Sequence, residues 1–365
     1  MLDFSRVLAG PFATMMLGDL GAEIIKVERP GTGDETRSWG PPHDVHGEAT
    51  YFQALNRNKR SIALDLKDPT DVARAKELTT RVDVLVENFR PGLLDGLGLG
   101  YDELSARNPG LIYCSVTGFG RGKGAAVTGY DLLVQALGGL MSITGPADGE
   151  PQKVGVALVD VLAGLFASTG ILAALRHRER SGRGQRVEVT LLAALLAALV
   201  NQGSAYTIAG VVPRRMGNAH PSISPYELYR AADRELVLAV GNDRQFAALC
   251  ETIGAPELPQ DARFETNARR VEHRDALRVE LERRLTQRPA EDWLEQLATA
   301  RVPAGVVNDI AEAVALATRL ELEPMVAIPR DGGDPVRLIR NPIELSETPA
   351  SYRIAPPPLP VMDEP

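Results

Sequence analysis

Four short apolar segments, separated by helical patterns, constrain the fold of this chain most strongly. They are EIIKVE (23–28), SIALDL (61–66), VDVLVEN (82–88) and LIYCSVTG (111–118). Each is apolar along most of its length, which is typical of a strand buried on both faces. Helical patterns opened by Pro11 and Pro69 precede the first and the third of these segments, at 11–22 and 68–81. This alternation predicts an α/β fold with a parallel sheet covered by helices on both sides.

The length of 365 residues favours two domains over one. Composition shifts to Gly, Pro and Ser near residue 209, and a hairpin pattern and charged amphipathic helices follow. We expect the chain to divide into four segments. Residues 1–208 form the N-terminal part of a large domain, 209–224 a linker, 225–307 a smaller α+β domain, and 308–365 a linker and C-terminal return to the large domain.

Charge and cysteine content exclude several classes of function. The net charge of −8 argues against nucleic acid as a partner, although a local basic site for a phosphorylated ligand remains open. Cys114 and Cys250 lie far apart, which indicates reduced thiols in the cytoplasm. The scattered histidines show no metal-ligand spacing, and MLDFSRVLAGP does not read as a signal peptide. A strand ending in LDFS is expected to begin upstream of Met1.

The familiar phosphate-binding and hydrolase motifs are missing: the chain has no G-x-G-x-x-G after its first strand, no P-loop and no G-x-S-x-G. Basic loops instead follow the predicted strands. They lie at 27–37, 56–61 (with Lys59 and Arg60), 65–69, 88–92 and 118–124. Ligands bind at the carboxyl edge of an open α/β sheet, so these loops predict a site for a polyphosphate tail.

One acid, Asp160, stands in the apolar stretch VGVALVDVLAGLFASTGILAAL (154–175). Three interpretations compete. A membrane span fits the length, but a central Asp costs roughly 2.5–3.5 kcal/mol there. A hydrogen-bonded structural Asp at a helix start is the second. The third interpretation, which the residues favour, is a functional carboxylate in a partly desolvated site.

Several longer segments carry a family resemblance. They are 9–37 (AGPFATMMLGDLGAEIIKVERPGTGDETR), 56–69 (NRNKRSIALDLKDP), 82–92 (VDVLVENFRPG), the Asp160 segment with GRGQRVEVTLL (182–192), and 216–246 (MGNAHPSISPYELYRAADRELVLAVGNDRQF). Together they resemble the class III coenzyme A transferases, the group of formyl-CoA transferase and carnitine CoA-transferase, whose fold α-methylacyl-CoA racemase shares. The resemblance covers essentially the whole chain.

The resemblance implies a Rossmann-like large domain whose parallel sheet is built from both chain ends, an inserted small domain, and an interlocked homodimer. It also implies that Asp160 is the nucleophile, because Asp160 stands where the family places it. Attack on an acyl-CoA thioester would give an aspartyl anhydride and then an aspartyl-CoA thioester, which a second carboxylic acid resolves. Coenzyme A is then a substrate, and neither a metal nor a further cofactor is expected.

The resemblance also carries over binding residues. The implied CoA contacts are Val7, Ala9, Arg29, Leu64, Lys67, Asn88, Phe89 and Arg90, and the implied acyl pocket contains Leu8, Tyr130, Arg214, Arg215 and Gly217. Arg29 and Lys67 would hold phosphates, while Leu64 and Phe89 would line the adenine. Simple core packing explains Leu64 and Phe89 equally well.

Two departures from the family bear on the substrate. Formyl-CoA transferases have Gln at the position of Leu8 and a run of glycines in the small domain, and this chain has neither, so formyl or oxalyl transfer is not expected. We hypothesise that Arg214 or Arg215 grips the second carboxylate of a dicarboxylic acyl group such as succinyl; a solvated basic pair is the alternative. Backbone amides near Gly138, Gly139 or Gly217 are candidates for stabilising the oxyanion.

Two other functions remain open. A racemase removes the α-proton and pairs a His with the Asp, in a segment reading GHDINY, whereas this chain has Tyr130 at the position of that His. A Tyr with a pKa of about 10 is a poor base at neutral pH, which favours transfer. A non-catalytic acyl-CoA-binding protein ranks last, because Asp160 is present.

Overall fold

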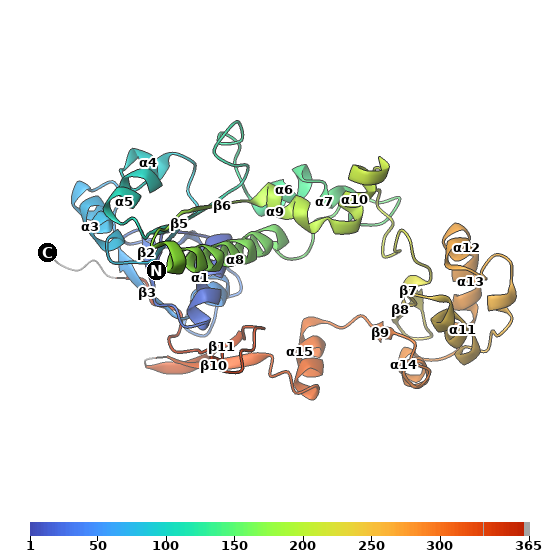
Figure 1. Ribbon diagram of the computed structural model, residues 1–365. Coiled ribbons are helices and arrows are strands. Elements are labelled where there is room, and N and C mark those ends of the chain that lie inside the picture. Colours follow the sequence, from blue (N-terminus) through green and yellow to red (C-terminus); the bar gives the residue numbers. More distant parts are fainter. Residues whose placement is uncertain (331, 361–365) are drawn as a thin grey trace. The chain divides into compact units, whose positions relative to one another are not determined.

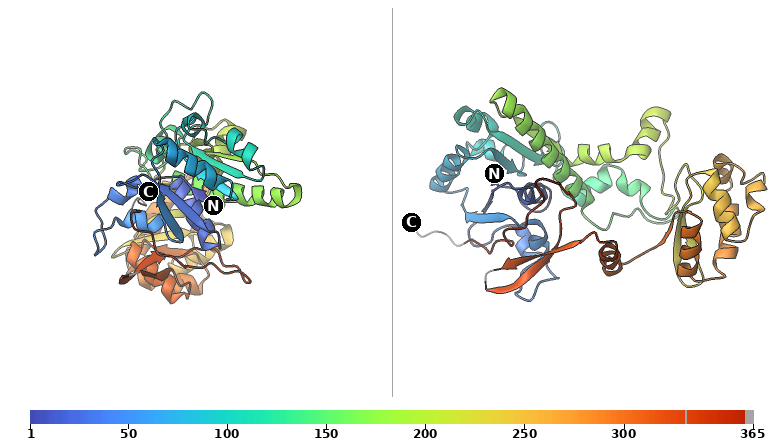
Figure 2. Two further views of the ribbon diagram at one scale, coloured as in Figure 1. Left: turned by 90° about the vertical axis from the view of Figure 1, so that its left-hand side faces the viewer. Right: turned by 60° about the horizontal axis from the view of Figure 1, so that its bottom comes forward.

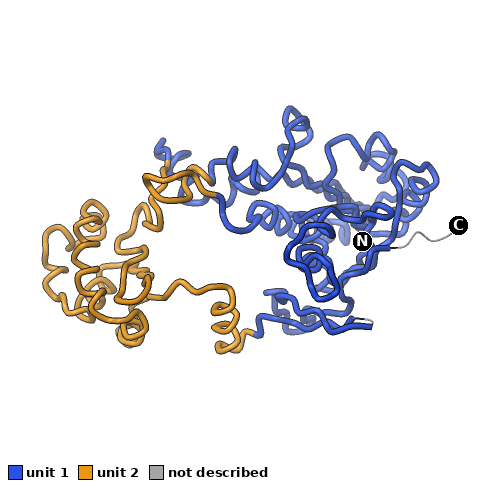
Figure 3. The backbone as a smooth tube through the Cα atoms, turned by 180° about the vertical axis from the view of Figure 1, so that it is seen from behind, with its two compact units in different colours: residues 1–140, 153–212, 323–365 blue, residues 141–152, 213–322 orange. Residues whose placement is uncertain are grey.

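The computed structural model describes residues 1–330 and 332–360, and the chain divides into two compact units (Figure 3). Unit 1 takes Met1–Leu140, Lys153–Val212 and the chain from Glu323 onward; unit 2 takes Met141–Gln152 and Pro213–Leu322. Unit 2 therefore contains more of the chain than the expected small domain of 225–307. One reason is that the Arg215 guanidinium binds the carbonyl oxygens of Pro146 and Gly149, which ties the 141–152 segment to the chain after residue 212.

Six parallel strands form the central sheet of unit 1, in the order β3-β2-β1-β4-β5-β6. Figure 1 labels four of them, β2, β3, β5 and β6. Their bounds are β1 (Leu2–Asp3), β2 (Ile24–Glu28), β3 (Lys59–Ala63), β4 (Val84–Glu87), β5 (Ile112–Thr117) and β6 (Arg186–Thr190). The predicted α/β fold with a parallel sheet is confirmed. Both chain ends were expected to build it, yet the described chain after Glu323 adds no strand to it. Proline lacks the N–H that a ladder needs, which suits this Pro-rich end to a different role.

Successive residues of the sheet face two separate helical layers. Val84 and Val86 of β4 pack in one core with helices α1 and α8, whereas Leu85 packs in a second core with Ala75 and Leu104 on the other face. The helices of the two layers are α1 (Ala9–Asp19) and α8 (Leu158–Ser181) on the first face, and α3 (Pro69–Thr79), α4 (Leu93–Gly96) and α5 (Tyr101–Arg107) on the second. Burial on both faces explains why β4 is mainly apolar.

The remaining elements of unit 1 surround this sandwich. They are the 3₁₀ turn η1 (Glu35–Ser38), α2 (Thr50–Leu55), α6 (Asp131–Leu137), α9 (Leu191–Ala198), α10 (Val200–Ala209) and the antiparallel pair β10 (Met325–Arg330) and β11 (Gly333–Ile339). The β10–β11 hairpin lies beside the N-terminal elements in Figures 1 and 2. Arg57 fixes it there, donating a hydrogen bond to the Ile339 carbonyl at 2.9 Å.

Unit 2 has its own core around the three-stranded antiparallel sheet β7-β8-β9. Its elements are α7 (Leu140–Ile143), β7 (Tyr226–Arg230), β8 (Glu235–Ala239), α11 (Asp243–Thr252), η2 (Leu258–Gln260), α12 (Asn267–Glu272), α13 (Arg274–Leu285), α14 (Ala290–Thr299), β9 (Ala304–Val306) and α15 (Ile310–Arg319). Leu238 of β8, Phe246, Leu281 and Trp293 are among the buried side chains that join the strands to the helices.

Helix α8 is long and apolar enough to cross a membrane by length and composition, and the bent pair α9–α10 passes the same test. In this fold, however, α8 packs against α1, α9, β5 and β6. Its apolar residues Val159, Ala163 and Ile171 are fully buried in the core of unit 1. One face of the helix therefore packs in the core of unit 1, whereas Leu165, Phe166 and Leu172 on the same helix are exposed.

Candidate active site

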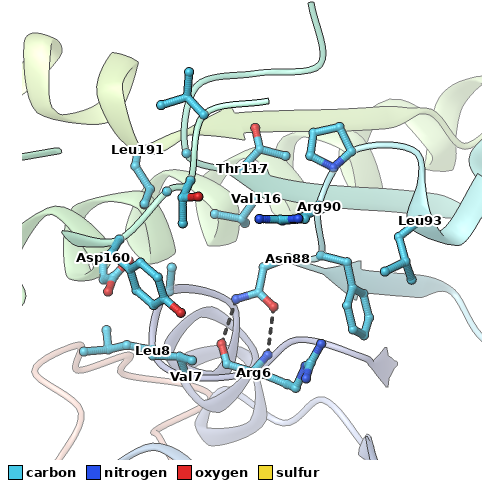
Figure 4. A pocket seen from close by; sticks show the side chains of 18 of the residues that line it. Arg6, Val7, Leu8, Asn88, Arg90, Leu93, Val116, Thr117, Asp160 and Leu191 are labelled. Atoms are coloured by element: carbon cyan, nitrogen blue, oxygen red, sulfur yellow. Dashed lines mark hydrogen bonds between the residues drawn. The ribbon is translucent and has the colours of Figure 1, made fainter. Parts of the chain in front are cut away.

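Asp160 lines a pocket of about 370 Å³ in unit 1, which we call the reaction pocket (Figure 4). Residues that sequence analysis singled out and that line this pocket are Val7, Leu8, Ala9, Asn88, Phe89, Arg90, Tyr130 and Asp160. They come from the loop after β1, the loop after β4, the start of α6 and the start of α8. The loops after β1 and β4 leave the carboxyl ends of adjacent parallel strands, where a ligand site is expected in such a sheet.

A second pocket, of about 470 Å³, lies next to the first, and we call it the nucleotide pocket. The predicted residues Arg29, Leu64, Lys67 and Phe89 line it. Arg29 and Lys67 are exposed, and neither is paired with a carboxylate among the described residues. Arg6, Phe89 and Leu93 line both pockets, so the two cavities adjoin along a shared wall.

Helix α8 brings Asp160 to the reaction pocket by packing closely on α1. A Cβ built at Gly164 would lie 2.7 Å from the carbonyl oxygen of Ala9 and 3.0 Å from the Phe12 ring, so only glycine allows this approach. Ala9 begins α1 and Asp160 is in the first turn of α8. The contact at Gly164 therefore sets the spacing between the loop after β1 and the Asp160 carboxylate.

The Asp160 carboxylate is half-buried and receives no hydrogen bond from the described residues. Burial, and secondarily the negative charge of Asp131, raise its pKa to about 7. Both effects disfavour the ionised form. A carboxyl group with a pKa near neutrality is ionised in a substantial fraction of molecules and is more basic than an ordinary aspartate, which suits a nucleophile or a base.

The loop after β1 holds a strained conformation at the wall of the reaction pocket. Val7 has a φ of 66°, which a β-branched residue rarely adopts. The Asn88 side chain accepts a hydrogen bond from the Arg6 N–H at 2.8 Å and donates one to the Arg6 carbonyl at 2.7 Å (Figure 4). Asp34 accepts from the Val7 N–H at 3.3 Å. Asn88 therefore clamps the backbone of this loop in addition to lining the pocket.

One basic residue that was expected to face a polyphosphate, Lys59, belongs instead to a buried ion pair. Lys59 is the first residue of β3 and is fully buried. Its Nζ atom lies 3.1 Å from an Asp3 carboxylate oxygen. Lys26 pairs in the same way with Asp34 at 2.8 Å. An ion pair with no exposure cannot bind a ligand, so the expected role of the 56–61 loop is wrong for Lys59. Sequence alone does not show that an acid lies opposite each of these lysines.

Arg214, Arg215 and Gly217 belong to unit 2, whereas the residues that line the two pockets belong to unit 1. Arg215 is occupied by two backbone carbonyls of the 145–150 turn, and the Gly217 N–H donates to the Gly145 carbonyl at 3.1 Å. Arg214 is exposed. Of the basic pair, Arg214 has the more available side chain.

Three residues of the site were not singled out from the sequence. Arg6 lines both pockets, pairs with Glu35 at 2.7 Å and lies over the Phe89 ring at 4.5 Å. Asp131 lies beside Asp160 and shifts its pKa. Tyr51 has a pKa of about 12, raised by burial and then by the charge of Asp160. Arg6 and Asp131 are each next to a predicted site residue in the sequence, and this proximity could have indicated them. No feature of the sequence indicated Tyr51.

Comparison with known proteins identifies the family. The model of CoA-transferase family III matches residues 1–361. The chain belongs to CoA-transferase family III. It is 44% identical over 358 residues to the succinate–glutarate CoA-transferase of Agrobacterium fabrum, covering 96% of this chain and 90% of that one. It is 43% identical to the acetyl-CoA:oxalate CoA-transferase of Acetobacter aceti, covering 95% and 88%.

A crystal structure of a CAIB/BAIF family protein from Brucella suis has the same fold, with a TM-score of 0.87 and 42% sequence identity over 98% of this chain and 94% of that one. The resemblance seen in the sequence is thus confirmed, and this family III protein is an enzyme that transfers coenzyme A. Coenzyme A is accordingly its substrate. Among the described residues, no group of three or more His, Cys, Asp or Glu is arranged to hold a metal ion.

Proposed function

We propose that this family III enzyme moves CoA between a dicarboxylyl-CoA and a carboxylic acid, with Asp160 as the nucleophile. The observation that carries the proposal is the position of Asp160 in a pocket that adjoins a second, basic-lined pocket. Glu35 also lines the reaction pocket, but Arg6 neutralises it at 2.7 Å. Asp160 has no such partner among the described residues and is the carboxylate free to attack.

The reaction would proceed in balanced steps. An Asp160 oxygen attacks the thioester carbon, and the CoA thiolate leaves, which gives an aspartyl anhydride. The thiolate attacks the Asp160 carbonyl carbon, which releases the first carboxylate and leaves an aspartyl-CoA thioester. The second carboxylate attacks this thioester, and the released thiolate then attacks the acyl carbon of the new anhydride. Product acyl-CoA leaves and the Asp160 carboxylate is restored.

We place the adenosine end of CoA in the nucleotide pocket. Leu64 and Phe89 offer apolar and aromatic surface to a base, while Arg29 and Lys67 offer unpaired cations to phosphates. Val7, Ala9, Asn88 and Arg90 line the reaction pocket, where the pantetheine arm would approach Asp160. Leu8 and Tyr130 would adjoin the acyl group.

The dicarboxylate assignment rests on the relatives and on Arg214. The Agrobacterium relative is named for succinate and glutarate and the Acetobacter relative for oxalate, and all three are dicarboxylates. We assign the second carboxylate to Arg214, because Arg215 is already held by backbone carbonyls. Changing Arg214 to Gln should raise the KM for dicarboxylates and leave that for monocarboxylates unchanged. An unchanged dicarboxylate KM would remove Arg214 from the site.

We further propose that the enzyme is an interlocked homodimer in the cytoplasm. Apolar side chains on α8, α9 and α10 are exposed in the single chain, which supports a partner surface. The residues are Leu165, Phe166, Leu172, Leu196, Val200, Tyr206 and Ile208. Both cysteines are free and buried, as in a reducing compartment.

Mass spectrometry tests the nucleophile directly. The enzyme is incubated briefly with succinyl-CoA, glutaryl-CoA, oxalyl-CoA and acetyl-CoA, and the peptide that contains Asp160 is analysed. We expect a CoA-sized adduct on this peptide with the true donor. In Asp160→Asn the adduct should vanish and the transfer rate should fall by more than about a thousandfold.

The same experiment separates the alternatives. An undiminished rate in Asp160→Asn would exclude Asp160 as the nucleophile. Exchange of α-protons with deuterated buffer and no adduct would indicate a racemase. Tyr130, which stands at the position of the racemase His, is 57% exposed. Binding with neither exchange nor adduct would indicate a non-catalytic acyl-CoA-binding protein.

A further inference from the structure

The first turn of α8 takes its cap from a residue far away in sequence. Ala157, at the N-cap position, has no capping side chain. The Asp131 carboxylate instead accepts hydrogen bonds from the backbone N–H of Val159 at 2.8 Å and of Asp160 at 3.3 Å. These are two of the N–H groups that the start of a helix leaves without an intrahelical partner. A negative charge at this end also interacts favourably with the helix dipole.

Asp131 is itself held in place by a buried amide. The Gln135 side chain is fully buried and donates a hydrogen bond to the second Asp131 oxygen at 2.6 Å. Its own oxygen accepts from the Val154 N–H at 2.9 Å. Asp131 and Gln135 lie one turn apart on α6. This helix therefore binds the backbone at Val154, before α8, and at the first turn of α8 itself. The position of the α8 start is therefore fixed from α6.

This arrangement explains why a carboxylate at the start of a helix receives no hydrogen bond. An acidic side chain in the first turn often turns back to the free N–H groups of its own helix. Here Asp131 already occupies the two N–H groups nearest to Asp160. The Asp160 oxygens are left without a donor among the described residues and line the reaction pocket (Figure 4).

We propose that Asp131 is a positioning residue for CoA transfer: it caps α8 from α6 and leaves both oxygens of Asp160 free to face the reaction pocket. This inference rests on the proposed role of Asp160 as the nucleophile. The charge of Asp131 acts in the same direction as burial, which is the larger cause of the raised Asp160 pKa.

Other ionisable groups lie near Asp160 or line the reaction pocket. Tyr51, on α2, has a pKa of about 12 and remains neutral at physiological pH. Tyr130 precedes α6, while Arg6 and Arg90 line the reaction pocket from the loops after β1 and β4. Arg6 is neutralised by Glu35. Asp131 is the acid whose charge acts on Asp160, so its removal should dominate any change in the titration.

Two substitutions separate the cap from the charge. Asp131→Asn keeps an oxygen that can accept from the α8 N–H groups but removes the charge, and Asp131→Ala removes both. We would titrate the Asp160 carboxyl carbon by ¹³C NMR in the substrate-free enzyme, with Asp160→Asn to assign the signal. We expect the pKa to fall by about one pH unit in Asp131→Asn, because a like charge is gone. In Asp131→Ala it should fall further, since the freed N–H groups can donate to Asp160.

Kinetics supply the second measurement. The rate at which the CoA adduct forms on Asp160 should fall about 100-fold in Asp131→Ala, as expected for a misplaced reacting group, and should be partly restored in Asp131→Asn. The affinity for CoA should stay within about twofold. Asp309, the capping residue of α15 in unit 2, provides the matched control: Asp309→Ala also uncaps a helix but should leave the rate unchanged.

The outcomes are distinct. An Asp160 pKa that stays the same in both variants, or an adduct rate in Asp131→Ala equal to that of the parent enzyme, would overturn the inference. If Asp131→Ala does not fold, the titration and rate of Asp131→Asn decide. If the parent enzyme forms no adduct on Asp160, the proposed function fails. The NMR titration then still shows whether Asp131 controls the Asp160 carboxylate.

Discussion

At Asp160 the same surroundings are costly for stability and useful for chemistry. A half-buried carboxylate without hydrogen bonds is unfavourable when ionised, and this is the state in which it can attack a thioester. The sequence revealed this residue because an acid in a long apolar stretch needs an explanation. Asp131, which lies near Asp160 in the structure, could not be predicted as part of the site. An Asp at a helix start is common, and the backbone groups that it binds lie 28 and 29 residues away in the sequence.

The raised pKa of Asp160 predicts the pH dependence of the reaction. Attack requires the ionised carboxylate, so kcat/KM should be low in acid, rise through about pH 7 and level off above it. An ordinary aspartate would give a flat profile over this range, because it is fully ionised above about pH 5. The measurement is kcat/KM for the identified donor between about pH 5.5 and pH 8.5. The affinity for CoA alone, measured over the same range, is the control.

Lys59 shows the limit of reading charges from sequence, because its role is set by Asp3, 56 residues earlier. Replacing Lys59 by Met leaves the Asp3 carboxylate buried without its cation, which should lower the free energy of unfolding by about 3–5 kcal/mol. Urea denaturation measures this loss. The neighbouring Arg60 is exposed, and Arg60→Met should change stability by less than about 0.5 kcal/mol. Equal effects of the two substitutions would contradict the assignment.

Among the elements, α8 links the core of unit 1 to its chemistry. Its buried apolar side chains pack against α1, β5 and β6, while its first turn presents Asp160. The strands and this helix could be predicted because apolar periodicity reports burial directly. The β10–β11 hairpin could not be predicted, because much of it is exposed and its Pro-containing, charged sequence has no clear period-two pattern.

The close contact between α8 and α1 can be tested at Gly164. In Gly164→Val the new side chain would collide with the Ala9 carbonyl, so one helix must move. We expect a loss of about 1–3 kcal/mol in unfolding free energy, as for other overpacked sites, together with a lower kcat, because Ala9 and Asp160 flank the same pocket. Gly122 is the control, since a Cβ there meets nothing within 4 Å. If Gly164→Val behaves like Gly122→Val, the contact does not set the pocket.

For the whole molecule, the exposed apolar residues of unit 1 bear on assembly. An aromatic side chain buried at an interface removes about 150–250 Å² from water, so charged replacements should weaken the proposed dimer strongly. We expect light scattering to give a dimer mass for the parent enzyme and a monomer mass, at low concentration, for the double variant Leu165→Asp, Phe166→Asp. Val279, an exposed apolar residue of unit 2, is the control as Val279→Asp. A parent monomer would refute the dimer.

Unit 1 is assembled from three separate stretches of chain. The last stretch supplies hydrogen-bond partners to buried polar residues of the first. Asp19 and Arg57 are buried together, yet Arg57 also binds the Ile339 carbonyl, and Asn341 donates to Asp19. Asn58 likewise binds the carbonyls of Ser351 and Ile354. A ribosome delivers these partners only after the whole of unit 2 has emerged.

Buried polar groups that lack their partners destabilise a fold, so the N-terminal sandwich should stay loose during most of translation. Unit 2 has a complete core within its own residues and can fold first. A stalled or truncated chain that ends before residue 339 should then contain a folded unit 2 joined to an open unit 1. The order of folding during synthesis would run opposite to the order of the sequence.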